Sequence, residues 1–378
     1  MRLSGQDGQD SVIRQDVDRQ VGRTVDCGTG VGLKLGFEEP NRRRFEVMAA
    51  LRTTRHRLIP SDSVQGGPGN PARRPTSAPY TYHRPMKFAI DIPNFGDFAD
   101  ARLTAQIARD AEDAGWDAVW VWDHVQRDAG VPYADPWILL TAIALATERI
   151  RLGPMVTPLP RRRPWLVARE AVTLDHLSGG RFTLGLGNGN PLREFTAFGE
   201  EADLKIRAAK LDEGLSIIEG LFTARPFNFQ GEHYHLKDVE FLPGPLQQPR
   251  VPIWLASTWP VRAPIRRAAR FDGTWPLRRS PDGSSHALSP DDVRGVCAMI
   301  AEERAATGLP AGLDEGPDAP PYDVLVAGIT PADDSAQAGA ITAPYAEAGA
   351  TWWTERINTE RGDISAMRRR VDAGPPRF

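Results

Sequence analysis

The segment from Ile150 to Gly189 constrains the fold of this chain more than any other part of it. Its first residues, IRLGPMV, form a short apolar run bounded by glycine and proline, which predicts a buried strand. Apolar residues recur at helical spacing from Trp165 to Leu177, and Gly179 can take the left-handed cap that ends a helix. FTLGLG then predicts a second strand. A strand, a helix and a parallel strand in this order form one βαβ unit.

The same alternation runs from Met86 to the end of the chain. The further strand patterns are KFAIDI, DAVWVWD, VPIWLA, GTWPL, YDVLVAG and TWWTER, and helix patterns such as 290–306 and 335–348 separate them. Eight strands that alternate with helices over about 290 residues are typical of a (β/α)₈ TIM barrel. The stretch FNFQGEHYHLKDVEFLPGPLQQPR predicts an inserted hairpin or long loop after the fourth strand. A doubly wound open sheet is the structural alternative.

Residues 1–85 differ from this barrel domain, residues 86–378. They contain none of the ten tryptophans, and 60–85 is rich in Pro, Gly, Ser and Arg, a composition that cannot bury enough apolar surface to fold alone. We expect a low-order, disordered extension. Three origins stay open: translation from an upstream start with Met86 as the natural one, a basic tail, or a small accessory element around Val21 to Leu58.

Composition excludes several classes of partner. The net charge of −3 gives no reason to expect nucleic acid or an anionic membrane. No apolar run approaches the roughly 18 residues that span a bilayer, and the first residues lack the apolar core of a secretory signal. Cys27 and Cys297 are far apart and lack flanking motifs, so we expect a cytoplasmic protein without disulfides.

Polar residues at the carboxyl ends of the strands are the catalytic candidates, because TIM barrels place their chemistry there. Asp123 and His124 follow the second strand, where a histidine beside a carboxylate can act as general acid or base. The alternative is a polar turn capped by Asp123. Glycines in the sequence GLGNG, residues 185–189, let a flat ligand approach the backbone, and the absence of GxGxxG before a helix excludes a dinucleotide fold.

Two further strand ends carry weaker signals. Thr157 is followed by Arg161, Arg162 and Arg163, which either bind phosphate or a polyacidic group or form a solvated surface run. The segment 257–259 follows VPIWLA and is either an anion site at a helix start or a simple helix cap.

The sequence does not predict a metal centre. His233 and His235 form an isolated His-x-His without a carboxylate cluster at other strand ends. The strand tryptophans are expected in the core; they are Trp120, Trp122, Trp254 and Trp352.

From Met86 to Phe378 the chain resembles the bacterial luciferase-like monooxygenase superfamily, whose members use FMN or the deazaflavin F420. The resemblance rests on the order of several segments: WDH, TERIRLG, AREAVTLDHLSGGRFTLGLGNG, GEHYHL, QQPRVPIW, RRAARFDGTW, AGATWW and GPPRF. It implies a TIM barrel with the cofactor ring at the carboxyl ends of the strands. It also implies a non-prolyl cis peptide bond at Met155–Val156, behind that ring.

The resemblance assigns roles to individual residues. His124 matches the histidine that F420-dependent relatives use in proton transfer, with Asp123 beside it. The cofactor-binding residues that we expect are Met155, Val156, Thr157, Gly187, Asn188, Gly189, Ser257, Thr258 and Trp259.

Departures from the family pattern bear on substrate and cofactor. Relatives that oxidise glucose 6-phosphate carry a Glu and a Trp where this chain has Asn190 and Asp128, so that sugar phosphate is not expected. Many FMN monooxygenases show Glu-His-His after the second strand, whereas this chain has Asp-His, which favours F420. We therefore expect F420-dependent hydride transfer to or from a small organic substrate. The oligomeric state stays open, and a homodimer is the state that the resemblance suggests. The alternatives are an FMN monooxygenase fed by a partner reductase, a cofactor-binding relative without turnover and, more distantly, a metal hydrolase.

Overall fold

The computed structural model describes residues 85–279, 285–310 and 322–377. The expectations for the N-terminal extension therefore lie outside the described residues, except for Pro85. All of the described residues belong to one compact unit of the chain.

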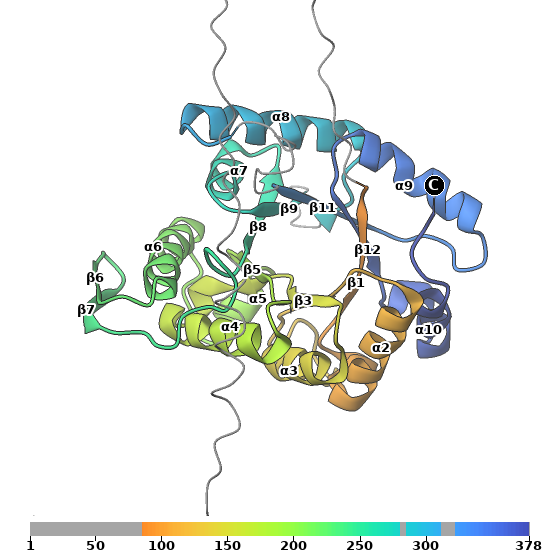
Figure 1. The fold of residues 1–378 in the computed structure, drawn as a ribbon, viewed down its shortest axis with the longest axis horizontal. Coiled ribbons are helices and arrows are strands. Elements are labelled where there is room, and N and C mark those ends of the chain that lie inside the picture. The colour runs from red at the N-terminus through yellow and green to blue at the C-terminus, as the bar shows by residue number, and fades with distance from the viewer. Residues whose placement is uncertain (1–84, 280–284, 311–321, 378) are drawn as a thin grey trace, which may run out of the picture. The chain divides into compact units, whose positions relative to one another are not determined.

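Parallel strands form a nearly closed barrel (Figure 1). Their hydrogen-bonded order is β3-β2-β1-β12-β11-β9-β8-β5-β4. The two ends of this order, β3 and β4, are consecutive parts of one strand that is interrupted at Met155–Val156. The sheet therefore returns to its starting strand, which confirms the TIM barrel and excludes the open sheet. The barrel strands are β1 (Lys87–Ile92), β2 (Ala118–Val121), β3 (Arg151–Pro154), β4 (Thr157–Pro158), β5 (Leu184–Gly187), β8 (Ile253–Trp259), β9 (Gly273–Arg279), β11 (Asp323–Gly328) and β12 (Trp352–Arg356).

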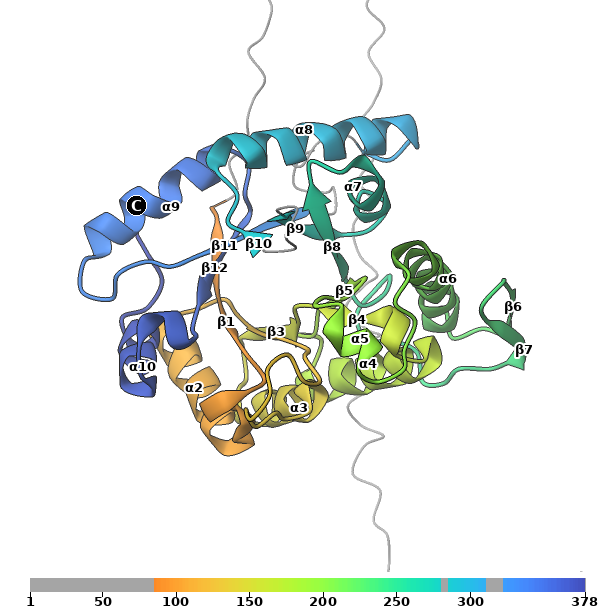
Figure 2. The same ribbon diagram turned by 180° about the vertical axis from the view of Figure 1, so that it is seen from behind.

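Helices surround the strands in both face views (Figures 1 and 2). Gly115 and Gly179 end α2 and α4 with φ values of 90° and 66°, as the sequence predicts for left-handed caps. The predicted helix 290–306 has the observed bounds of α8. The helices are α2 (Ala101–Ala114), α3 (Pro136–Ala146), α4 (Pro164–Ser178), α5 (Arg193–Thr196), α6 (Leu204–Phe222), α7 (Arg262–Ala268), α8 (Pro290–Ala306), α9 (Ser335–Glu347) and α10 (Ile364–Asp372), with short 3₁₀ turns η1 (Gly96–Ala99), η2 (Leu159–Arg161) and η3 (Thr359–Arg361).

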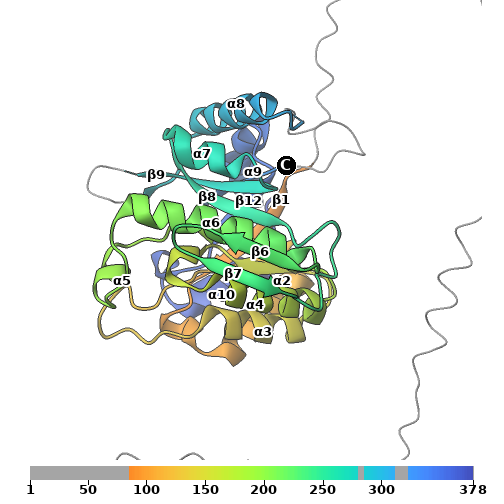
Figure 3. The same ribbon diagram turned by 90° about the vertical axis from the view of Figure 1, so that its left-hand side faces the viewer.

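The predicted insertion is an antiparallel hairpin of β6 (Phe227–Gln230) and β7 (His235–Val239). It projects outside the helical layer beyond α6 (Figures 1 and 3). A further short strand, β10 (Ser285–His286), pairs antiparallel with β9.

The expected boundary after the fifth barrel strand is wrong. β8 continues to Trp259, and α7 begins only at Arg262 after Val261, so the segment 257–259 lies within a strand and not at a helix start. Pro264 falls in the first turn of α7, where proline is tolerated, and does not interrupt the helix as the sequence suggested.

Side-chain alternation separates two apolar layers. On β1, Phe88 and Ile90 pack towards the helices, whereas Ala89 faces the barrel interior. Trp120, Trp254 and Trp352 fill that interior with edge-to-face contacts at centroid distances of 5.2–5.6 Å.

The predicted core role is therefore confirmed for these three tryptophans. Trp122 remains partly exposed at the carboxyl end of β2.

Candidate active site

Asp123 lies directly beyond β2 and is buried, with 4% of its surface exposed. Its carboxylate accepts a hydrogen bond from the Thr157 hydroxyl at 2.7 Å. Arg161 and Arg162 approach it at 3.0 and 3.2 Å. Asp123 therefore serves as a buried counter-ion rather than as the cap of a local turn.

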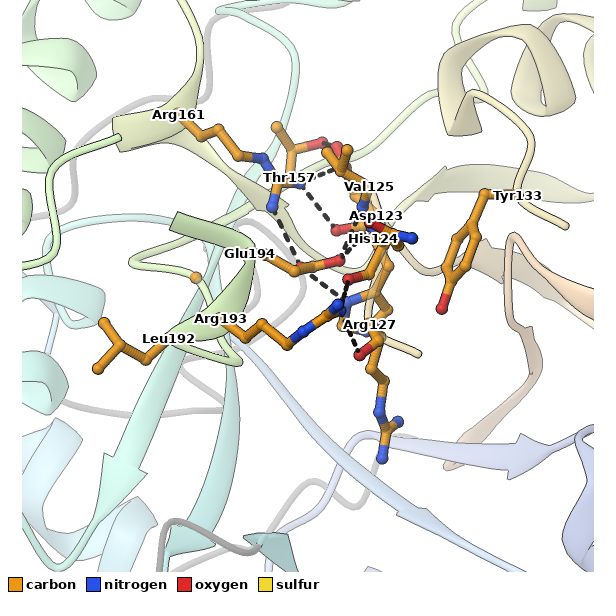
Figure 4. A network of polar contacts seen from close by, with 12 residues as sticks. Asp123, His124, Val125, Arg127, Tyr133, Thr157, Arg161, Leu192, Arg193 and Glu194 are labelled. Carbon is orange, nitrogen blue, oxygen red and sulfur yellow. Dashed lines mark hydrogen bonds and ion pairs between the residues drawn. The ribbon is translucent and has the colours of Figure 1, made fainter. Parts of the chain in front are cut away.

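His124 is held at its backbone by Asn94 and at its ring by Glu194, and Figure 4 shows the ring contact. The Asn94 amide group accepts from the His124 N–H at 3.1 Å and donates to the His124 carbonyl at 2.7 Å. Nδ1 of the ring lies 3.0 Å from the Glu194 carboxylate. Nε2 forms no hydrogen bond with any described residue, so this nitrogen is free to face a ligand.

Glu194 is the residue that the sequence analysis missed. Its carboxylate is fully buried and accepts hydrogen bonds from the backbone N–H groups of Val125 and Gln126 at 2.8 and 2.9 Å. Arg161 adds an ion pair at 3.1 Å. Burial opposes ionisation, but the hydrogen bond and charge of His124, with Arg161, lower the pKa of Glu194 below its ordinary value. It is therefore a carboxylate at neutral pH and can stabilise a protonated His124.

Arg161 and Arg162 have neither of the two predicted roles, whereas Arg163 is exposed, as a surface run predicts. Arg161 is largely buried and bridges Asp123 and Glu194, while Arg162 pairs with Asp123. Two of the three predicted surface or phosphate-binding cations are therefore internal partners of the catalytic candidates. Arg163 does not pair with any acid among the described residues, and its guanidinium lies 5.9 Å from the Trp165 ring.

The third barrel strand, β3 with β4, and the fourth, β5, meet behind the expected cofactor position. The peptide bond between Met155 and Val156 is cis and non-prolyl, as the resemblance implies. Met155 is buried in the interior cluster, and a Cβ on Gly187 would lie 2.7 Å from Val156 Cγ2. Only glycine therefore fits at position 187 in this arrangement.

The glycine-rich end of β5 leaves one buried acceptor free. Asn188 donates from Nδ2 to the Leu204 carbonyl at 3.4 Å, while its buried Oδ1 has no partner among the described residues. Gly189 has a φ of +85°, a conformation that favours glycine.

The segment 257–259 lies within β8 and not at the helix start on which the anion-site prediction rested. The Ser257 hydroxyl lies 2.8 Å from that of Thr274, and Trp259 donates its indole N–H to Asp292 at 2.9 Å. These two side chains connect β8 to β9 and α8. Thr258 is partly buried, and no hydrogen bond of its side chain with a described residue is present. None of the three caps α7.

Other site types find no support in the described part of the chain. No group of three His, Cys, Asp or Glu side chains lies close enough there to hold a metal ion. Likewise, none of its helices has the length and apolar character needed to cross a bilayer. His233 donates its backbone N–H to Glu213, which organises the hairpin turn.

Similarity to solved structures concerns the fold. The F420-dependent tetrahydromethanopterin reductase of Methanopyrus kandleri matches with a TM-score of 0.61 and 17% identity over 77% of this chain and 98% of the other. An F420-dependent secondary alcohol dehydrogenase in complex with an F420-acetone adduct matches with a TM-score of 0.56 and 18% identity, over 78% and 92% of the two chains. At these identities the matches show the common barrel only.

Two curated proteins share a higher sequence identity with part of this chain. The F420-dependent glucose-6-phosphate dehydrogenase of Amycolatopsis mediterranei (strain U-32) is 38% identical over 159 residues, which are 40% of this chain and 46% of that protein. The protein of the same name from Kineococcus radiotolerans is 35% identical over 48% of this chain and 53% of its own length. The chain thus spans about half the length of the curated relatives it matches.

A family model described as luciferase-like monooxygenase matches residues 83–352. This range includes the barrel strands up to Trp352 and the site around His124, and it agrees with the motifs that carry the resemblance. The chain therefore belongs to the luciferase-like monooxygenase family.

Proposed function

We propose that this chain is an F420-dependent oxidoreductase that transfers hydride to or from a small organic substrate, with His124 as the general acid or base. One observation carries the proposal. His124 lies at the carboxyl end of β2, its Nδ1 is fixed by the buried carboxylate of Glu194, and its Nε2 has no partner among the described residues. This is the arrangement that a proton-transfer histidine requires.

The residues at the ends of the third and fourth barrel strands fit a flat cofactor. Gly187 and Gly189 keep side chains away from the backbone, and the free Oδ1 of Asn188 is an acceptor for a hydroxyl group of the cofactor side chain. Met155, Val156 and Thr157 would support the ring from the other side. Bound F420 would supply a carbon centre that accepts or donates hydride.

His124 and Glu194 would handle the proton that accompanies hydride transfer. When an alcohol is oxidised, the carbon loses hydride and the hydroxyl group loses its proton, which passes to Nε2 of His124. The Glu194 carboxylate then stabilises the imidazolium, and Asp123 with Arg161 keeps Glu194 in place. The reverse sequence returns the proton to a carbonyl oxygen during reduction.

Two observations support F420 over FMN, and a third supports a substrate other than a sugar phosphate. The two dehydrogenase relatives are F420-dependent, and the Asp-His pair departs from the Glu-His-His of many FMN enzymes. Asn190 accepts a hydrogen bond from Arg279 at 3.2 Å and cannot supply the acid that those dehydrogenases carry at this place. The second candidate is an FMN monooxygenase with a partner reductase, because a Baeyer-Villiger monooxygenase in complex with FMN shares the fold with a TM-score of 0.53.

Titration of the full-length chain with F420 and with FMN, each oxidised and reduced, tests the cofactor. We expect micromolar binding of F420 and at least about tenfold weaker binding of FMN, a difference of about 1.4 kcal/mol. Stronger FMN binding would move the protein to oxygen chemistry. Binding of neither cofactor by folded protein would refute the proposal, and binding without turnover of any alcohol or ketone would indicate a non-catalytic relative.

Substitution of His124 by alanine tests the catalytic role. We expect a loss of turnover of about 100- to 10,000-fold with cofactor affinity retained, because general acid–base catalysis contributes on this scale. An unchanged rate would exclude His124 as the proton-transfer group.

The Glu194→Gln variant tests the positioning role of Glu194. Turnover should fall by about tenfold or more while KM stays within about threefold, since the amide cannot stabilise a charged imidazole. Nitrogen-15 NMR of the ring should show that His124 loses its single tautomer. Glu213→Gln is the matched control, because Glu213 binds backbone N–H groups of the hairpin and should not affect the His124 signals.

The homodimeric state and the cytoplasmic location stay proposals that rest on the resemblance and the composition. Sedimentation of the full-length chain and fractionation of cells that produce it would check them.

A further inference from the structure

Unpartnered polar side chains gather in one part of the barrel interior. Of the buried side-chain atoms without a hydrogen-bond partner among the described residues, about half lie on three neighbouring strands, β2, β1 and β12, or directly beyond β2. Buried polar groups are nearly always hydrogen-bonded, so such a concentration needs an explanation. They belong to Asp91, Trp120, Trp122, Thr354 and Arg356, whereas Trp352 stands in register with Lys87 at the start of β1 and its indole interacts with Asp323.

Asp91 and Arg356 are the charged members of this cluster. Asp91 stands in register with Trp120 on one side and Arg356 on the other. It alternates with Ile90 and Ile92, which pack towards the helices, and therefore faces the interior. Asp91 is fully buried, and neither of its oxygens has a hydrogen-bond partner of good geometry among the described residues. The Arg356 guanidinium is partly exposed and donates no hydrogen bond to a described residue.

A purely structural role does not explain Asp91. Other buried acids of the described chain have several partners: Asp175 accepts from two backbone N–H groups and Gln247, and Glu194 from Val125, Gln126 and Arg161. An unpartnered carboxylate in the interior costs stability and contributes no hydrogen bond in return. Residues of this kind are retained where a ligand or reaction needs them.

The charged groups around Asp91 also support a role in ligand binding. Burial raises the pKa of Asp91 to about 6, and the charge of Arg356 and a contact of hydrogen-bond type with the Trp122 indole oppose that rise. Glu360 and Arg361, near η3, act on the same carboxyl with opposite signs. The carboxylate and guanidinium thus balance each other without a direct ion pair, which leaves the donors of Arg356 free.

We propose that Arg356 binds a carbonyl or carboxylate oxygen of the ligand, and that the buried carboxylate of Asp91, in register with Arg356, balances the charge of the guanidinium at that site. This inference rests on the proposed function, because it places an acceptor oxygen in the same barrel as His124. Arg356 is the reachable member, since it is partly exposed while Asp91 is covered. The oxygen belongs either to the carbonyl edge of the cofactor ring or to the substrate, and a guanidinium recognises both.

The test uses the full-length chain with the variants Arg356→Gln, Arg356→Lys and Asp91→Asn. Thermal unfolding is measured without ligand at neutral pH, and binding is measured with F420 and, on the F420-loaded protein, with acetate as a carboxylate probe. Glu355→Gln is the control for a buried acid that has partners. Arg356→Lys retains the charge, so it tests geometry if the glutamine variant does not fold.

We expect Asp91→Asn to raise Tm by about 3 °C or more, because it removes an unpaired buried charge. Arg356→Gln should weaken F420 binding at least tenfold if the ring supplies the oxygen. If the substrate supplies it, F420 affinity stays and acetate binding is lost. A lower or unchanged Tm of Asp91→Asn, or unchanged binding of both probes in the arginine variants, would overturn the inference. Failure of wild type to bind F420 or FMN would instead refute the proposed function.

Discussion

Two buried carboxylates lie on adjacent strands of the barrel but face opposite layers. Glu355 on β12 stands beside Ile90 of β1, one position before the pair of Arg356 and Asp91. Glu355 faces the helices, where it accepts hydrogen bonds from Thr330 N–H at 2.7 Å, from the Thr330 hydroxyl and from the Trp353 indole. Asp91 faces the interior and has no such set of donors.

The two acids differ because one face of a barrel strand packs against the helices and the other faces the barrel interior. Glu355 also pairs with Arg361 and Arg370, so it links β12, the loop after β11 and α10 into one polar cluster. Its interactions are complete in the absence of any ligand. Asp91 stands at the carboxyl end of β1 among groups that lack partners, which is what a site prepared for a ligand requires. The number of hydrogen-bond partners therefore distinguishes Glu355 from Asp91, the acid that we place at a ligand site.

Replacement of Glu355 by glutamine should have the largest effect on stability. The buried Arg370 and the largely buried Arg361 side chain would lose their counter-ion, and removal of one partner from such a cluster costs about 3–5 kcal/mol. Urea denaturation of the full-length chain measures this change. A loss below about 1 kcal/mol would show that the cluster is hydrated and that the comparison with Asp91 does not hold.

The pH dependence of stability should set Asp91 apart from the acids that have partners. Its folded pKa of about 6 lies above the ordinary value of 3.8, so its contribution to stability is complete below about pH 4 and is lost as the pH rises through about 6. Asp91→Asn should match wild type near pH 4 and exceed it by up to about 3 kcal/mol at neutral pH. Urea midpoints across this range provide the measurement. A difference that does not vary with pH would mean that Asp91 does not titrate in this range.

For Glu194, the pH dependence of the stability contribution should have the opposite sign. Its pKa is lowered by His124 and Arg161 against the effect of burial, so its contribution is present above its ordinary value and is lost as the pH falls through the folded pKa. Glu194→Gln should therefore lose stability relative to wild type at neutral pH and approach it in acid. A stability difference that widens in acid would contradict this assignment.

Two threonines provide the smallest and most closely matched comparison. The Thr330 hydroxyl donates to Glu355 at 2.8 Å and accepts from Arg370 at 2.9 Å, whereas the Thr354 hydroxyl is buried without a partner among the described residues. Thr330→Val should cost about 1–2 kcal/mol, and Thr354→Val should be neutral or slightly stabilising. Equal losses in denaturation would show that the interior hydroxyl is hydrogen-bonded after all, for example to water.

Local sequence signals predicted most of the fold. The periods of 2 and 3.6 residues and the glycine caps placed α8 and the ends of α2 and α4 well, since these features depend on neighbours within a few positions. Proline was the weaker guide, because its effect in α7 depends on whether it falls in the first turn. The strand-end rule also selected Asp123 and His124 as candidates, and both lie just beyond β2 in the structure.

The rest of the site could not be predicted, for two physical reasons. Glu194 stands on α5, a helix of four residues, which is too short to produce a periodic signal. Its partnership with His124 spans 70 positions and arises from barrel closure. Three consecutive arginines look like a solvated surface, and only the fold shows that Arg161 meets two buried acids.

The sequence by itself determined the barrel, its insertion, its family and the strand end that carries His124, because these follow from short-range periodicity and from motifs in a fixed order. Tertiary structure alone decided which charges are satisfied: Arg161 and Glu194 by each other, Glu355 by two arginines, and Asp91 by no direct ion pair among the described residues. The sequence shows the same residue type whether or not its charge has a partner in the folded protein. Its partners come from distant strands and helices, and their distances are fixed only when the barrel closes.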